Sequence, residues 1–433
     1  MVYVNFIIFL GFCIYFIKKR EDIINLYPLL LWTIAALASI FYSQSVIFRR
    51  FHNFTLIPFL YLAILFLLLF LSVKSEPLKT VSKCKSPILL PIIWLIALTS
   101  YLPFMELLYH FITSGVDFSN IADVKDEYTS GEYDPRNILT PLSSKLFAFS
   151  AYSWFISPIL FFYYITVNST KTIYNKIIVC GFIISYLNPL LLGMTVGTRG
   201  ALLWALLYFF QIFLFFRNVI PLKAKRIINK SFLCVAVGVM ALFMAITISR
   251  FSSDQYSDYA LTDWVYRYMG ESFCNFNTEC WYTRGVTLGK NCFAFFSSIV
   301  GGDGQRNYLM LERITGTRMN VYNTLFGDLL YDFGHFPAII FVLCLCYISS
   351  KLRPRNGTFK LPNFLLYSVC FYVLLSGFLI WPLITKAYSF WGTILVSVLI
   401  FITQGSSTSK NNKNANINNY SQLQHEETHG RLY

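Results

Sequence analysis

Arginine predominates among the basic residues where this sequence is polar. The stretch 250–322 carries seven basic side chains, six of them arginine, in a chain that is otherwise mostly apolar. The planar guanidinium binds carboxylate or phosphate oxygens through two parallel hydrogen bonds, whereas a lysine ammonium acts as a point charge. The bias toward arginine therefore indicates recognition of a planar or phosphorylated group. Arg306 and Arg313 lie seven residues apart, on one face of a helix predicted over 305–315. Asp303 is its predicted N-cap.

Two further arginines lie at the ends of apolar runs. Arg199 follows Gly197-Thr198 and precedes an apolar run that begins at Ala201. A cation at a helix N-terminus opposes the helix dipole, so its placement costs free energy unless an anion lies nearby. We therefore expect Arg199 to bind an anion. Arg250 follows the C-terminal end of its run, where the dipole favours a cation, and an interfacial role and an anion-binding role stay open for it.

Acidic and histidine side chains also occur at helical spacing. Glu106 and His110 lie one turn apart near the outer end of an apolar run, where ionisable groups are functional candidates, and mutual pairing is the alternative. Asp328 and Asp332 are also one turn apart and precede His335. Carboxylates near a helix N-terminus are stabilised by the helix dipole, so capping and proton transfer both stay open for this pair.

Metal and nucleotide chemistry receive no support from the sequence. The histidines are dispersed and no Cys-x-x-Cys is present, so we predict no metal site and no cofactor. The glycines of 301–304 lack the P-loop lysine, and Asp332-Phe333-Gly334 stands without the other kinase motifs. Cys274, Cys280 and Cys292 lie in the stretch 250–322, where an oxidising compartment would permit one disulfide and leave one thiol.

The composition specifies the elements that must position these residues. Hydrophobic residues make up 56% of the chain and charged residues only 13%, which excludes a soluble globular domain. We predict an all-α polytopic membrane protein with about eleven transmembrane helices. The apolar runs are 2–17, 26–48, 56–73, 88–113, 146–168, 176–196, 200–216, 231–249, 325–350, 361–382 and 387–404.

Orientation follows from the basic residues of the short loops. Lysine and arginine accumulate on the cytoplasmic side. The lysine-rich loops assigned to that side are 18–25, 74–86, 169–175, 217–230 and 351–360. The N-terminus is then periplasmic, and so are the long loops 114–145 and 250–322. The formal net charge of +14 is accounted for by this topology and requires no nucleic acid.

The domain organisation is simple. Residues 1–404 are predicted to form a single transmembrane domain, and 405–433, rich in Asn, Ser and Lys, a disordered cytoplasmic tail. Short amphipathic helices are expected in the loop 250–322. The helix predicted over 258–273 suits the membrane surface, with Asp263, Arg267 and Glu271 as a solvated ladder of charges on one face.

Several of these features occur together in one known family. Gly197-Thr198-Arg199-Gly200 begins one span, an arginine-bearing outer loop follows, and Asn323 precedes Asp332-Phe333-Gly334 at the start of the next span. This layout resembles the O-antigen and capsular-polysaccharide polymerases of the Wzy type, over most of residues 90–400. Related ligases often carry His-Asn where this sequence has Tyr322-Asn323. The sequence departs from the ligases at that point.

The resemblance implies an inverting glycosyl transfer at the periplasmic face of a bacterial inner membrane. The donor would be a growing glycan on undecaprenyl diphosphate, and the acceptor a lipid-linked repeat unit. The lipid bilayer and a chain-length regulator protein would be further partners. The diphosphate would be bound by Arg199, Arg250, Arg306 and Arg313, and the proton accepted by Glu106, Asp332 or His335. Prearranged cations that stabilise the departing diphosphate suit this chemistry.

Two alternatives keep the membrane architecture. A flippase of lipid-linked oligosaccharides would carry its cations in a cavity within the spans and would show internal repeats, and none is seen. An O-antigen ligase would differ in its acceptor, and the absence of a histidine before Asn323 disfavours it.

Overall fold

The computed structural model describes residues 1–45, 53–113, 134–168, 172–196, 198–251, 261–296, 306–319 and 321–404. Regular structure in these ranges is helical, apart from one isolated antiparallel bridge between Arg355 and Thr358. The all-α prediction is confirmed for this part of the chain. The predicted tail 405–433 and residues 114–133 of the first long loop lie outside the described residues.

The helices follow one another with short connections. The first half contains α1 (Val2–Lys18), α2 (Ile23–Gln44), α3 (Leu56–Val73), α4 (Leu89–Thr99), α5 (Tyr101–Thr113), the 3-10 helix η2 (Pro135–Ile138), α7 (Pro141–Tyr152), α8 (Ile156–Val167), α9 (Ile173–Thr195) and α10 (Arg199–Phe216). The second half contains α11 (Leu222–Phe251), α12 (Leu261–Thr278), η4 (Cys280–Tyr282), α13 (Tyr308–Thr315), α14 (Thr324–Phe333), α15 (His335–Leu352), α16 (Leu361–Ser376), η6 (Pro382–Ile384) and a last helix, Ala387–Gln404.

The chain is a multi-pass membrane protein by helix length and hydropathy. Six helical segments among the described residues are long and apolar enough to cross a bilayer: α2, α3, α4 with α5, α9, α15 and the last helix. A seventh crossing results if α7 and α8 form one bent span. Three further apolar helical segments are shorter, at 10–17 residues: α1, Gly200–Phe216 of α10, and α16. Fewer spans therefore qualify among the described residues than the eleven predicted.

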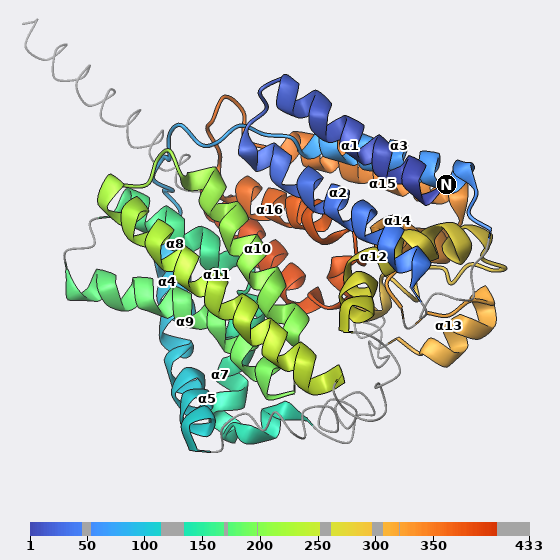
Figure 1. Ribbon diagram of the computed structural model, residues 1–433. Coiled ribbons are helices and arrows are strands. Elements are labelled where there is room, and N and C mark those ends of the chain that lie inside the picture. The colour runs from blue at the N-terminus through green and yellow to red at the C-terminus, as the bar shows by residue number, and fades with distance from the viewer. Residues whose placement is uncertain are drawn as a thin grey trace, which may run out of the picture.

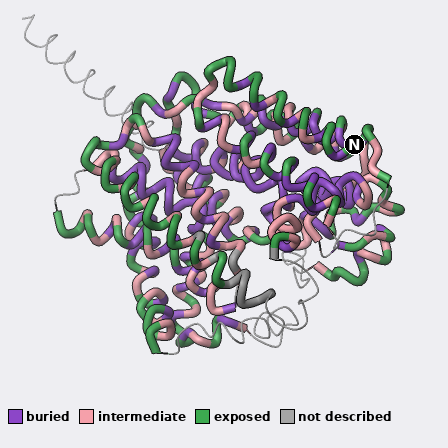
Figure 2. Tube along the Cα trace, in the orientation of Figure 1, coloured by how far each residue is buried: buried purple, intermediate pink, exposed green. Residues whose placement is uncertain are grey.

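The helices form two bundles. In one, α2 packs against α1 and α12, and α15 packs against α3, α14 and α16. In the other, α9 packs against α4, α5, α7, α8 and α10 (Figure 1). Contacts of α10 with α2 and α16 join the two bundles. Nearly every residue of α16 is buried, and Figure 2 shows buried residues gathered through the middle of the molecule. The junction between the bundles is therefore the core.

Four of the lysine-rich loops lie together at one end of the bundles. Arg217 Nη2 donates to Asp22 Oδ2 at 2.5 Å, and Lys74 pairs with Glu21. The amide of Lys79 donates to the carbonyl of Gly357 at 2.8 Å. These bonds connect the loops 18–25, 74–86, 217–230 and 351–360, so the loops assigned to the same side of the membrane from sequence are neighbours in space.

Helix α12 packs closely along α2. A Cβ added at Gly270 would lie 2.5 Å from the amide nitrogen of Ser39 and 2.6 Å from the carbonyl oxygen of Ala38, so only glycine permits this approach. Glu271 is 4% exposed and accepts a hydrogen bond from Arg267 Nε at 3.2 Å. The prediction of a solvated ladder was therefore wrong for Glu271, whose pKa is raised by burial.

Two predicted continuous spans are broken. The run 146–168 forms α7 and α8, which are bent by 73° at residues 153–155. The run 325–350 forms α14 and α15, which meet at Gly334 with a φ of 76°. A left-handed residue ends a helix because it turns the backbone away from the helical path, and glycine adopts it without steric cost. The break separates the two aspartates from the apolar helix that follows.

Candidate functional site

Helix α14 is fixed at its start by the chain that follows α16. The amides of Asn323 and Thr324 both donate to the carbonyl of Leu379 at 3.1 Å, and the amide of Leu325 donates to Gly377 at 2.7 Å. Thr324 has a φ of 59°, a strained value for a β-branched residue, and its hydroxyl accepts from the amide of Gly327 at 3.1 Å. These bonds position the two carboxylates of α14.

Asp332 anchors a loop that is distant in sequence. Its Oδ1 accepts from the amide of Asn291 at 2.9 Å and from the hydroxyl of Thr287, and its Oδ2 accepts from the amide of Cys292 at 2.6 Å. The residue is fully buried. Since both oxygens are already bonded, the contacts give Asp332 a structural role in holding residues 287–292. Its role as proton acceptor stays a prediction.

Asp328 is bonded to a second segment and to the same asparagine. Its Oδ2 accepts from the amide of Trp381 at 2.7 Å, and its Oδ1 accepts from Asn291 Nδ2 at 3.2 Å. Burial raises the pKa of Asp328, and the positive charge of Arg306 opposes that rise. The carboxylate thus ties the loop before the last helix to the segment around Asn291.

Asn291 connects both aspartates to an arginine. Its amide group bonds Asp328, its backbone bonds Asp332, and its Oδ1 accepts from Arg306 Nη1 at 2.6 Å. Arg306 is half-buried, and its guanidinium lies 5.1 Å from the ring centroid of Tyr308. It forms no direct ion pair with a described carboxylate. Asn291 therefore holds the arginine in place without a direct ion pair, and its positive charge acts on Asp328 across the asparagine.

Arg313 is on the short helix α13 and is exposed. This helix begins at Tyr308, with the side chain of Asn307 accepting from the amide of Met310 at 3.0 Å. The predicted start at residue 305 was therefore wrong, and Arg306 precedes the helix. The predicted N-cap, Asp303, lies outside the described residues. The two arginines consequently do not share one helical face.

His335 begins α15 beside two aromatic rings. Its imidazole is edge-on to Trp281 with ring centroids 4.3 Å apart, and to Tyr61 at 6.2 Å. Tyr61 also donates its hydroxyl to the carbonyl of His335 at 2.6 Å. Within the described residues, the buried Nε2 of this imidazole has no hydrogen-bond partner. Of the three predicted proton acceptors, Glu106 and Asp332 have both carboxylate oxygens hydrogen-bonded. His335 alone keeps a potential accepting atom, Nε2, without a partner among the described residues.

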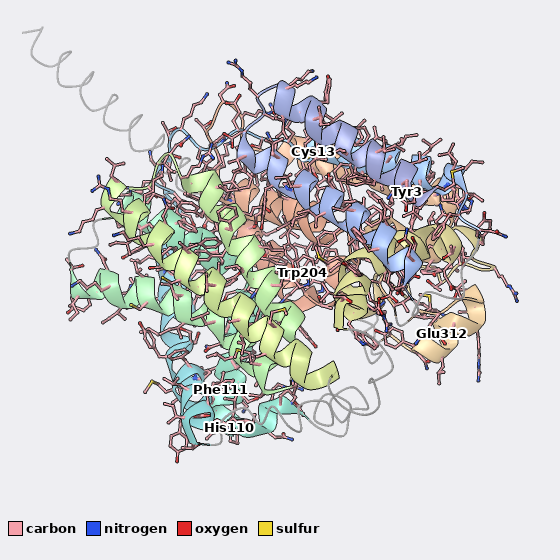
Figure 3. All side chains as sticks on the ribbon, in the orientation of Figure 1. Tyr3, Cys13, His110, Phe111, Trp204 and Glu312 are labelled. Atoms are coloured by element: carbon pink, nitrogen blue, oxygen red, sulfur yellow. The ribbon has the colours of Figure 1, made fainter. Side chains whose placement is uncertain are left out.

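Glu106 binds a residue that lies 34 positions away in the chain. Its two oxygens accept from the amide and the hydroxyl of Thr140, both at 2.8 Å, just before α7 begins. Figure 3 shows His110 at the end of α5, on a different side of the molecule from Glu312 of α13. His110 thus lies away from α13, and Glu106 holds the start of α7.

We predict that Glu106→Ala lowers the free energy of unfolding by about 1–3 kcal/mol, the cost of two hydrogen bonds at about 0.5–1.5 kcal/mol each, and leaves the activity proposed below unchanged. Thermal unfolding of the purified protein in detergent checks the first part, and turnover per folded molecule the second. Complete loss of the proposed activity at normal stability would contradict this purely structural role of Glu106.

The remaining predicted residues include two arginines whose side chains are not described. Arg199 is the first residue of α10, and Arg250 lies in the last turn of α11; the structure describes no contact of either side chain. The sequence left open whether Cys274, Cys280 and Cys292 form a disulfide, and in the structure all three are unpaired and buried. No group of metal-binding side chains is found among the described residues.

Sequence analysis missed Thr287 and Asn291. Neither residue stands in a recognisable motif, and their partners on α14 are 37 to 45 residues away in the chain.

Comparisons with protein-family models, with curated proteins and with solved structures found no match.

Proposed function

We propose that this protein is a polysaccharide polymerase that joins lipid-linked oligosaccharide repeat units, an inverting glycosyltransferase acting outside the inner membrane. The observation that supports this most is the setting of Arg306, a cation held by Asn291 without a directly paired carboxylate among the described residues. A departing polyprenyl diphosphate develops negative charge, and prearranged cations lower the barrier to such a departure.

The proposed reaction uses groups of this chain alone. A sugar hydroxyl of the acceptor attacks the anomeric carbon of the donor, the bond to the diphosphate oxygen breaks, and the proton passes to His335 Nε2. Arg306 binds the diphosphate as it leaves, together with Arg199, Arg250 and Arg313. The substrates are undecaprenyl-diphosphate-linked glycans, with a chain-length regulator as a protein partner. No nucleotide sugar, metal or other cofactor enters the scheme.

The site is proposed to face the periplasm, in a chain with eleven crossings, an external N-terminus and a cytoplasmic C-terminus. The contacts among the four lysine-rich loops support this orientation, since basic loops that share one side of the molecule fit the positive-inside rule. The short apolar helices α1, α10 and α16 and the long helix α11 supply the additional crossings.

The orientation predicts which exposed positions a membrane-impermeant thiol reagent reaches. Native cysteines of the outer loop are buried, so engineered ones are needed. In intact spheroplasts we expect Lys290→Cys to be labelled and Lys79→Cys to be protected until the membrane is opened; both native side chains are exposed. Peptide mass spectrometry separates these sites from native cysteines. The reverse pattern would invert the topology.

Deletion of the gene distinguishes the proposed function from its alternatives. Loss of a polymerase leaves single repeat units attached to the final acceptor, loss of a flippase leaves none, and loss of a ligase leaves long chains on the lipid carrier. Complementation with Arg306→Ala, at equal protein abundance, is expected to reproduce the polymerase phenotype. Either of the other two glycan patterns would overturn the proposal.

A further inference from the structure

A lysine lies against the break between α7 and α8. Lys386 directly precedes the last helix, and its Nζ is 4.0 Å from the ring centroid of Trp154. Trp154 is 1% exposed and belongs to the three residues at which the two helices bend by 73°. The ammonium group thus lies over an aromatic face at an interruption of the apolar helices.

The charge of Lys386 has no counter-ion among the described residues. The ion pairs found there involve Lys74, Lys79, Arg136, Arg217 and Arg267. The face of a tryptophan stabilises an ammonium by only about 0.5–2 kcal/mol, whereas ionisable groups placed among membrane helices are costly and are usually functional. Such a half-buried cation is suited to an anion that arrives with a ligand.

Its position is fixed by tight packing. Ser389 Oγ donates to the carbonyl of Ala151 at 2.7 Å, and a Cβ added at Gly392 would lie 2.3 Å from the carbonyl oxygen of Tyr152. The carbonyl of Lys386 accepts from the amide of Phe390 at 2.9 Å, within the first turn of the last helix. The lysine is therefore built into the junction of two helices and is not a free surface side chain.

The junction adjoins the segment that follows Asn291. Phe390 and Trp391 contact Phe295 at centroid distances of 6.4 and 6.2 Å, and Trp391 contacts Phe296 at 5.0 Å. Asn291 accepts a hydrogen bond from Arg306, and Phe295 and Phe296 follow it in the chain. These packed residues connect the arginine to the helical turn that begins after Lys386. Arg306 and Lys386 are thus linked through packed residues, and each cation lies against one aromatic ring, Tyr308 and Trp154 respectively.

We propose that Lys386 binds a phosphate group of the lipid-linked donor at the break between α7 and α8. This inference rests on the proposed function. The anionic phosphate would replace the Trp154 face as the partner of the ammonium, while the polyprenyl chain extends along the apolar helices. An ordinary phospholipid headgroup carries the same chemistry and is the alternative source of the phosphate.

The test is a binding measurement on the purified, full-length protein in phosphatidylcholine nanodiscs. Lys386→Gln is expected to weaken binding of undecaprenyl diphosphate roughly tenfold to hundredfold, the factor for one lost charge-assisted hydrogen bond, and Lys386→Arg to retain most of it. Lys145→Gln, an exposed position on α7, is the matched control and should bind normally. Equal affinity for wild type and Lys386→Gln would overturn the proposal.

Two further measurements separate loss of binding from misfolding of the variant and from binding of an ordinary phospholipid. In the wild-type protein, undecaprenyl diphosphate should protect Lys386 but not Lys145 from amine acetylation, a readout that needs no folded variant; lack of protection would overturn the proposal. If native mass spectrometry instead shows retained phosphatidylglycerol lost in Lys386→Gln, with diphosphate binding unchanged, the site is a headgroup site and the proposal is wrong. Because binding is measured without turnover, its outcome is separate from that of the gene deletion.

Discussion

Replacing Arg306 by lysine is expected to reduce polymerisation roughly tenfold to hundredfold, nearly as much as replacing it by alanine. One nitrogen of the guanidinium donates to Asn291, and among the described residues the others have no hydrogen-bond partner, so we expect them to bind the diphosphate. A lysine ammonium retains the charge, but it cannot donate to Asn291 with one nitrogen and to a diphosphate with two others in the same plane. Losing a charge-assisted hydrogen bond costs about 1.5–3 kcal/mol, which gives this factor if the bond is made in the transition state.

The measurement is the rate of chain extension by purified protein, or glycan chain length in a complemented deletion strain at equal protein abundance. Lys290→Ala is the control, because Lys290 is exposed and next to Asn291 in sequence but absent from its described contacts. Normal chains in Arg306→Lys would mean that only the charge matters, and the proposed recognition of the diphosphate by a fork would be withdrawn.

Asp332→Asn is expected to destabilise the protein and to abolish activity. The wild-type carboxylate accepts from two backbone amides and one hydroxyl. An asparagine offers only one oxygen, so its amide group must face a buried amide of Asn291 or Cys292, and donor then meets donor. Each hydrogen bond to the ionised group that is lost costs about 1.5–3 kcal/mol, and an unmet buried donor adds to that.

Thermal unfolding and limited proteolysis of the segment 287–296 check this expectation. Glu76→Gln removes a carboxylate that is 65% exposed and should change stability little, since surface ion pairs contribute about 0–1 kcal/mol. If Asp332→Asn unfolds at the wild-type temperature but is inactive, the anchoring role is refuted and proton transfer becomes the better account of this residue.

The sequence predicted that the chain is a helical membrane protein, but it did not predict where the helices are interrupted. Apolar composition identifies a membrane protein however its helices are arranged. The break between α14 and α15 has a signal in the sequence, because Gly334 lies at it. The bend at residues 153–155 lies inside the predicted apolar run 146–168, and the one polar residue of the bend, Ser153, does not interrupt the hydropathy enough to mark it. Such bends depend on packing against distant helices, here the close contact of Gly392 with Tyr152.

The candidate site was predicted only in its charged components. Residue type identified Arg306 and Asp332, because cations and carboxylates are rare in this chain. Asn291, which joins them, could not be identified, since its bonds connect positions 15 to 41 residues apart. The contact of Glu106 could not be predicted for a related reason: an apolar helix with one carboxylate looks the same whether the acid serves chemistry or holds Thr140. The contacts of Asn291 and Glu106 are hydrogen bonds between residues far apart in the chain, and such bonds leave no pattern in the sequence.

The buried, unpaired state of Cys274, Cys280 and Cys292 has a consequence for biogenesis. A chain that matures with free thiols requires no thiol oxidase and no disulfide isomerase. If the loop is exported, its cysteines meet an oxidising compartment before they are enclosed, so packing of α12 and α14 must outpace thiol exchange. The speed of that packing, more than the final stability, then sets the yield of correctly assembled protein.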